Sequence, residues 1–140
     1  MPIGVLSSYQ VTLMNRIINV DMPKNAYISW FVTTQNALPT KVVLKDDNGK
    51  EYFSAKKQNY LNTSIDPPLA LGATFFTGSK LTLTIDVDTK YELKGKPTLI
   101  DITDDNGNIV GKSFDLAVED YTDNDYNDIY VNIVGWTHKG

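Results

Sequence analysis

The sequence predicts an all-β protein, an antiparallel β-sandwich with Greek-key connections, and three observations support this fold class. Short segments rich in β-branched and aromatic residues recur along the chain, and several alternate apolar and polar residues. Gly, Pro and Asn-Gly turn signals separate these segments. No segment shows the apolar period of an amphipathic helix. Several short strands joined by turns, without helices between them, are typical of two packed antiparallel sheets.

The first three expected strands lie in the N-terminal third of the chain. The segment 8–20 mixes β-branched, aromatic and polar residues, and Pro23-Lys24-Asn25 ends it. The segment 26–34 is the strongest strand candidate, because most of its residues are aromatic or β-branched. The segment 40–45 carries three consecutive aliphatic residues and completes this group.

Two similar turns are expected to form β-hairpins. Asp46-Asp47-Asn48-Gly49 leads into a strand at 50–55, and Asp104-Asp105-Asn106-Gly107 connects 98–103 with 108–110. Asn-Gly favours a type I′ turn, because both residues tolerate positive φ. The repetition is compatible with a weak internal duplication or with convergent turn chemistry.

The remaining strands surround a long connection and an acidic segment. Residues 58–71 are polar and contain two prolines, which is typical of a connection. Strands are expected at 73–77 and at 80–87, where apolar residues alternate strictly with polar ones. Strands at 114–118 and 129–134 would enter and leave the acidic segment.

Composition bounds the function. With 140 residues, the chain is expected to form one domain, 1–140. The net charge of −4 and the absence of a basic patch argue against nucleic-acid binding. The absence of Cys excludes disulfides and thiolate metal sites. The N-terminus lacks the features of a signal peptide and no segment is long enough to span a membrane, so we expect cytoplasmic synthesis, with release or surface attachment open.

The most informative segment is the acidic decapeptide 119–128. It contains five carboxylates and two side-chain amides but no Lys or Arg: Glu119, Asp120, Asp123, Asn124, Asp125, Asn127 and Asp128. Carboxylates this close repel one another, so a cation is expected to compensate them. Hard oxygen donors without His or Cys favour Ca²⁺ over zinc or copper, and Mg²⁺ rarely accepts a cage made only of protein ligands.

Two other interpretations of this segment were considered. Asp123, Asp125 and Asn127 have the spacing of the first EF-hand ligands, but Asp128 stands where the loop needs Gly and Val134 where it needs Glu. The EF-hand is therefore rejected. A solvated charged turn is the other interpretation, and the regular alternation of oxygen donors makes it less favoured.

The wording of residues 119–128, followed by an apolar strand, Trp136 and a C-terminal Gly140, resembles the calcium-mediated fucose- and mannose-binding lectins of pseudomonads and related bacteria. This resemblance implies a β-sandwich with two neighbouring Ca²⁺ ions. It assigns the metal ligands as Glu119, Asp123, Asp125, Asn127, Asp128, Asn36 and Gly140, the last from a partner subunit. Gln35 is the competing alignment for Asn36. The resemblance also assigns sugar contacts to Asp120, Asp123, Asp128 and Asn36.

The function expected from this resemblance is non-enzymatic, Ca²⁺-dependent binding of a mannose- or fucose-like carbohydrate by a homodimer or higher homo-oligomer. The alternative is a structural or assembly protein in which calcium only stabilises the fold. Ala37-Leu38-Pro39 favours this alternative, because it offers no side-chain hydroxyl where the family's specificity loop is rich in Ser and Gly.

Other motifs point to no catalytic chemistry. Gly111-Lys112-Ser113 follows a hairpin rather than opening a helix, so it is not expected to bind phosphate. His138 is the only histidine and has no evident nucleophile partner, which supports a non-enzymatic function. Trp30 and Trp136 lie within strand patterns and are expected in the core rather than stacked on sugar rings.

Overall fold

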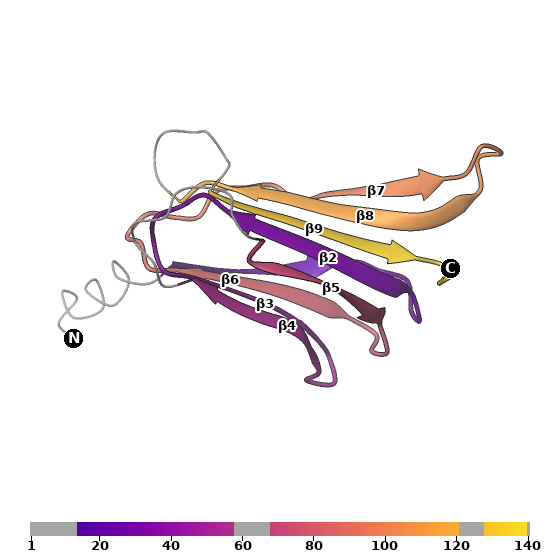
Figure 1. The fold of residues 1–140 in the computed structure, drawn as a ribbon, viewed down its shortest axis with the longest axis horizontal. Helices are drawn as coiled ribbons and strands as arrows, with labels where there is room; N and C mark the ends of the chain where they lie inside the picture. Colours follow the sequence, from indigo (N-terminus) through magenta and orange to yellow (C-terminus); the bar gives the residue numbers. More distant parts are fainter. Residues whose placement is uncertain (1–13, 58–67, 121–127, 140) are drawn as a thin grey trace, which may run out of the picture.

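The computed structural model describes residues 14–57, 68–120 and 128–139 and folds them into two antiparallel sheets packed face to face (Figure 1). One sheet has the order β1-β6-β3-β4, with β1 (Met14–Val20), β6 (Leu81–Val87), β3 (Thr40–Asp46) and β4 (Glu51–Lys57). The other has the order β5-β2-β9-β8-β7, with β5 (Ala70–Phe75), β2 (Tyr27–Thr34), β9 (Ile129–Trp136), β8 (Ile109–Val118) and β7 (Thr98–Thr103). The predicted antiparallel β-sandwich is confirmed.

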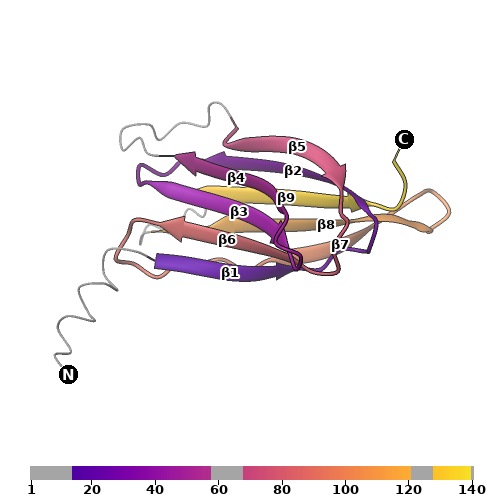
Figure 2. The same ribbon diagram turned by 90° about the horizontal axis from the view of Figure 1, so that it is seen from below.

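Strands that are distant in the chain become neighbours, as Greek-key connections require. β6 lies between β1 and β3, and β9 lies between β2 and β8. Seen from the side of the four-stranded sheet, the two layers stack with their strands nearly aligned (Figure 2). Most of the residue contacts that define the fold are therefore long-range pairings between strands.

The core lies between the sheets and follows the alternation of the strands. In β6 the apolar residues are buried and the intervening threonines and Asp86 are only partly buried. Ile28, Leu44 and Leu83 are among the fully buried side chains. Each such aliphatic side chain contributes about 1.5–3 kcal/mol when removed from water. The core thus holds the strand ends that carry the acidic segment in fixed positions.

The two tryptophans have different environments. Trp30 is buried in the core, as expected, and its ring packs against Phe53 with 5.6 Å between centroids. Trp136 is 36% exposed, so the expectation that it lies in the core is wrong. Because alternate residues of a strand face opposite sides, Gly135 faces inward against Met22 and Trp136, the last residue of β9, faces outward.

The two Asn-Gly hairpins form, but not with type I′ turns. Gly49 and Gly107 have φ near +84° and +83°, whereas Asn48 and Asn106 do not have positive φ. In the first turn the Gly49 N–H donates to the Asp46 carbonyl, and the strand register shifts beside it between Leu44 and Lys45. This is a type I turn with a glycine bulge.

An aspartate determines this turn type. Oδ1 of Asp46 accepts hydrogen bonds from the backbone N–H groups of Asn48 and Lys50, and Asp104 does the same for Asn106 and Asn108. A side-chain oxygen that accepts from the residue two positions later favours the type I geometry. The aspartate two residues before the Asn therefore overrides the type I′ preference of Asn-Gly.

Several strand bounds differ from expectation. β4 and β9 each extend two residues beyond their expected ends, to Lys57 and Trp136. β8 is one continuous strand through Gly111-Lys112-Ser113, because these residues pair with β7 on one side and β9 on the other. β5 begins at Ala70, inside the expected connection, because Ala70 pairs with Val32 of β2. In β8 and β5 pairing with distant strands overrides the local composition. Among the described residues, no helix is long and apolar enough to cross a membrane.

Candidate metal and ligand site

The acidic segment begins where β8 ends and returns to the sheet where β9 begins. Val118 and Ile129 are directly opposite in the β8–β9 ladder, so Glu119 and Asp120 leave the sheet beside Asp128. An isolated bridge between Glu119 and Lys94, with N–H to carbonyl distances of 2.8 and 2.9 Å, holds the backbone at this exit. The rigid sheet thereby places three acidic residues at one end of the sandwich.

These three carboxylates form a buried cluster. Glu119, Asp120 and Asp128 are 0%, 3% and 8% exposed. Each offers one oxygen, and these oxygens lie within 4.8 Å of one another. The Asp120 backbone N–H donates to Oδ2 of Asp128 at 2.9 Å. Burial of several carboxylates so close together is unfavourable unless protons or cations compensate their charge.

The titration of Asp128 reflects this environment. Burial raises the pKa of Asp128 to about 8, and a hydrogen bond with the Glu119 side chain and the charge of Asp120 act in the same direction. The hydrogen bond from the Asp120 backbone opposes the rise in pKa. Asp128 therefore retains a proton near neutral pH in the absence of a compensating cation.

Asn36, two residues beyond β2, completes the described part of the cluster. The side chain is 3% exposed, and Nδ2 donates to Oδ2 of Asp120 at 2.9 Å and to Oγ1 of Thr40 at 2.6 Å. The backbone N–H groups of Gln35 and Asn36 both donate to the Asp128 carbonyl, at 2.9 and 3.3 Å. The loop after β2 is thus fastened to the start of β9.

Oδ1 of Asn36 is buried without a hydrogen-bond partner. Buried polar atoms nearly always have a partner, and an orphaned oxygen beside a carboxylate cluster is one that a cation would satisfy. The atoms available to bind a metal are carboxylate and amide oxygens, with no nitrogen or sulfur ligand among them. The cluster therefore fits a hard cation such as Ca²⁺. The residues of this site therefore fit the ion that the lectin resemblance implies.

Several residues assigned by the resemblance lie outside the described residues. These are Asp123, Asp125, Asn127 and Gly140. Of the assigned positions that are described, the structure brings together all four, namely Asn36, Glu119, Asp120 and Asp128. Gln35, the competing position, contributes its backbone N–H to the Asp128 carbonyl.

Three residues of the site were not expected from the sequence. The Lys57 ammonium donates to the main-chain carbonyl of Asn36, Thr40 accepts from the Asn36 amide, and Oγ1 of Thr89 donates to the Asp120 carbonyl at 3.3 Å. Burial lowers the pKa of Lys57, and the charge of Asp120 partly opposes this effect. Strand pairing could have indicated that Lys57 lies near this site. Lys57 pairs with Thr40 in the β3–β4 hairpin, and Thr40 follows Asn36 by four residues.

The segment Ala37-Leu38-Pro39 borders the cluster. Leu38 packs against the core, and its carbonyl accepts from Oγ1 of Thr40 at 3.0 Å. The Pro39 carbonyl accepts the Asp88 N–H at 3.0 Å. This loop is held to the rest of the sandwich by its backbone.

Comparison with known proteins supports the fold. No protein-family model matches the sequence, and no curated protein matches it significantly. Solved structures do match: a Chromobacterium violaceum lectin in complex with alpha-methyl-fucoside has 18% identity and a TM-score of 0.60 over 88% of this chain and 96% of the lectin. The C-terminal domain of a Burkholderia cenocepacia lectin has 15% identity and a TM-score of 0.62, over 90% of this chain and all of that domain.

A high-affinity mannose-binding lectin of Ralstonia solanacearum has 17% identity and a TM-score of 0.60, over 88% of this chain and 96% of that lectin. The chain spans nearly the full length of all three structures, so the similarity concerns the whole sandwich. The resemblance predicted from the acidic segment is confirmed at the level of the fold, and this chain has the β-sandwich of these three bacterial lectins.

Proposed function

We propose that this protein is a non-enzymatic, Ca²⁺-dependent carbohydrate-binding protein. The observation that carries the proposal is the buried cluster of Glu119, Asp120 and Asp128 beside the unsatisfied Oδ1 of Asn36. The lectin fold supports it independently, because the comparison rests on strand arrangement and the cluster on side-chain chemistry. Buried carboxylates that lie this close together favour a bound cation.

The proposal assigns the cation to a set of oxygen ligands from several parts of the chain. Glu119, Asp128 and Oδ1 of Asn36 would hold the cation, together with Asp123, Asp125 and Asn127 of the acidic segment. Gly140 of a second copy of the chain is proposed as a further ligand, in a homo-oligomer. Two Ca²⁺ ions are proposed, since the decapeptide carries five negative charges.

When bound, calcium supplies open coordination positions at which vicinal hydroxyls of a sugar can replace water. The chain's own contribution is orientation. Asp120 is proposed to accept hydrogen bonds from sugar hydroxyls, and the amide of Asn36 already fixes its Oδ2. Asp123, Asp128 and Asn36 are the other proposed sugar contacts, and a mannose- or fucose-like ligand is proposed because the similar structures are lectins of that specificity.

A second candidate is a calcium-stabilised structural protein without a sugar ligand. The Ala37-Leu38-Pro39 loop favours it, since Leu38 packs on the core and none of the three side chains carries a hydroxyl. In this case calcium would stabilise the fold only by binding the native state.

A calorimetric titration with calcium, followed by addition of methyl mannoside or methyl fucoside, separates the two candidates. The proposed function predicts calcium binding and then sugar binding that chelator abolishes. Asp120→Asn should lower the affinity for the sugar at least about tenfold, because an amide is a poorer hydrogen-bond acceptor than a carboxylate. Calcium binding without any response across a glycan array would leave the structural candidate.

A further inference from the structure

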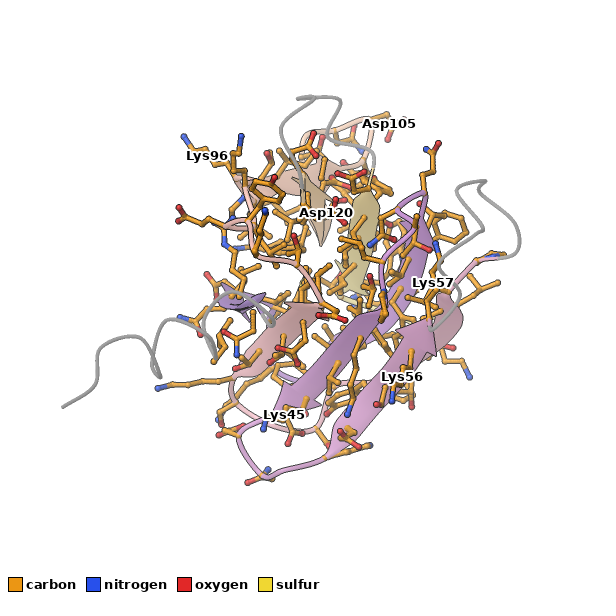
Figure 3. The ribbon with its side chains drawn as sticks, turned by 90° about the vertical axis from the view of Figure 1, so that its left-hand side faces the viewer. Lys45, Lys56, Lys57, Lys96, Asp105 and Asp120 are labelled. Carbon is orange, nitrogen blue, oxygen red and sulfur yellow. The ribbon has the colours of Figure 1, made fainter. Side chains whose placement is uncertain are left out.

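Lys57 is a cation that the chain itself brings to the acidic cluster. It is the last residue of β4, and its Nζ donates to the main-chain carbonyl of Asn36. In Figure 3, Lys57 is labelled on the side of Lys56 that faces Asp120. The pairing of β4 with β3 therefore fixes the position of this positive charge.

Asn36 and Asp120 connect Lys57 to the acidic cluster. Asn36 links the ammonium to the carboxylates, because its carbonyl accepts from Lys57 while its Nδ2 donates to Asp120. The negative charge of Asp120 acts to raise the pKa of Lys57, against the effect of burial, as expected for an ammonium near a carboxylate. One residue, Asn36, thus accepts from the lysine through its main chain and donates to the carboxylate cluster through its side-chain amide, whose Oδ1 is buried and unsatisfied.

We propose that Lys57 is an internal competitor of calcium: its ammonium partly neutralises the cluster when the ion is absent and opposes the ion when it binds. This inference rests on the proposed function. Two positive charges near one another repel, and in a partly buried site the effect on a divalent ion is on the order of tenfold in affinity. Lys57 thus lowers the affinity for calcium and stabilises the calcium-free fold.

A purely structural role for Lys57 predicts the opposite sign. If the ammonium only fastens the Asn36 loop, its removal loosens the site and weakens calcium binding. Competition predicts tighter binding. Under either role, removal of the lysine lowers the stability of the calcium-free protein. The direction of the change in calcium affinity therefore separates the two roles.

The test compares Lys57→Gln and Lys57→Arg with the matched control Lys56→Gln. Lys56 is the adjacent residue and changes the net charge equally, but it is exposed and lies opposite Lys41 on the outer face of the sheet. Calcium dissociation constants are measured by calorimetry at low and high salt, and melting temperatures are measured in chelator.

Competition predicts that Lys57→Gln binds calcium about tenfold more tightly at low salt, with a smaller gain at high salt because salt screens the charge. The same variant should melt at a lower temperature in chelator. Lys57→Arg, which retains the charge, should stay within about threefold of the parent, and Lys56→Gln within about twofold.

Unchanged or weaker calcium binding by Lys57→Gln, relative to Lys56→Gln, would overturn the inference while leaving the proposed function intact. If neither the parent nor Lys57→Gln binds calcium, both the inference and the proposed function fail. Binding by Lys57→Gln alone would support the competition, and would show that the lysine replaces the ion in the parent.

Discussion

At the scale of single residues, the chemistry of the site comes from acceptors that the fold buries together. Glu119, Asp120 and Asp128 are nearly inaccessible, and the donors to this cluster include the Asp120 N–H and the Asn36 amide. The Lys57 ammonium donates to the adjoining main-chain carbonyl of Asn36. The cluster can be stabilised by protons on Asp128 or by a cation. Which of the two compensates the charge depends on pH and on calcium.

The raised pKa of Asp128 predicts a specific pH dependence for the calcium-free protein. A carboxyl group whose pKa rises from 3.8 to about 8 on folding favours the folded state in its protonated form. This contribution is complete below the ordinary pKa and is lost as pH rises through about 8. In chelator, the melting temperature should therefore fall by several degrees between about pH 5 and about pH 9.

Saturating calcium should remove this fall, because the cation then takes the place of the proton. Asp128→Asn is the control: its amide oxygen can still accept from the Asp120 N–H, but it does not titrate, so its melting temperature in chelator should vary less with pH. A parent melting temperature that stays constant over this range in chelator would contradict the account of the cluster.

At the scale of elements, the two aspartate turns show how one local motif is used in two environments. Asp46 is 5% exposed and also accepts from the Tyr52 hydroxyl at 2.8 Å, in addition to its two backbone donors. Asp104 makes the corresponding turn but is exposed. Burial acts to raise the pKa of Asp46, and the hydrogen bonds from Tyr52, Asn48 and Lys50 outweigh it, so the pKa is lowered.

We expect Asp46→Ala to destabilise the fold by about 2–4 kcal/mol, because several donors, one of them a buried hydroxyl, lose their acceptor. Asp104→Ala should cost less than half as much, since water can replace the lost acceptor at the exposed turn. Urea unfolding of both variants measures the difference. Equal losses would show that the turn itself, and not the buried contact to Tyr52, determines the stability.

The elements also show where local pattern has limited power. The alternation in β6 predicts its buried face correctly, because one face of that strand meets the core. The start of β5 and the continuity of β8 depend on pairing with β2, β7 and β9, which local composition does not encode. Trp136 shows the same limit: β9 extends two residues beyond the expected 129–134 to include it, and its exposure follows from facing outward at the end of the strand.

At the scale of the whole molecule, the sandwich brings together residues that are 84 positions apart, as in the contact between Asn36 and Asp120. The sequence predicts the fold class because strand periods and turn residues are local signals. It also predicts the acidic part of the site, since Glu119, Asp120 and Asp128 are close in the chain. Lys57, Thr40 and Thr89 enter the site through sheet topology and loop packing, for which no local pattern gives a signal.

The central claim is that the end of the sandwich beside Asn36 and Asp128 binds calcium, and a crystal structure obtained in millimolar calcium tests it most directly. The account predicts ion density coordinated by carboxylate oxygens of Glu119 and Asp128 and by Oδ1 of Asn36, at distances of about 2.3–2.6 Å. Well-ordered side chains in this cluster with no ion among them, at saturating calcium, would contradict it.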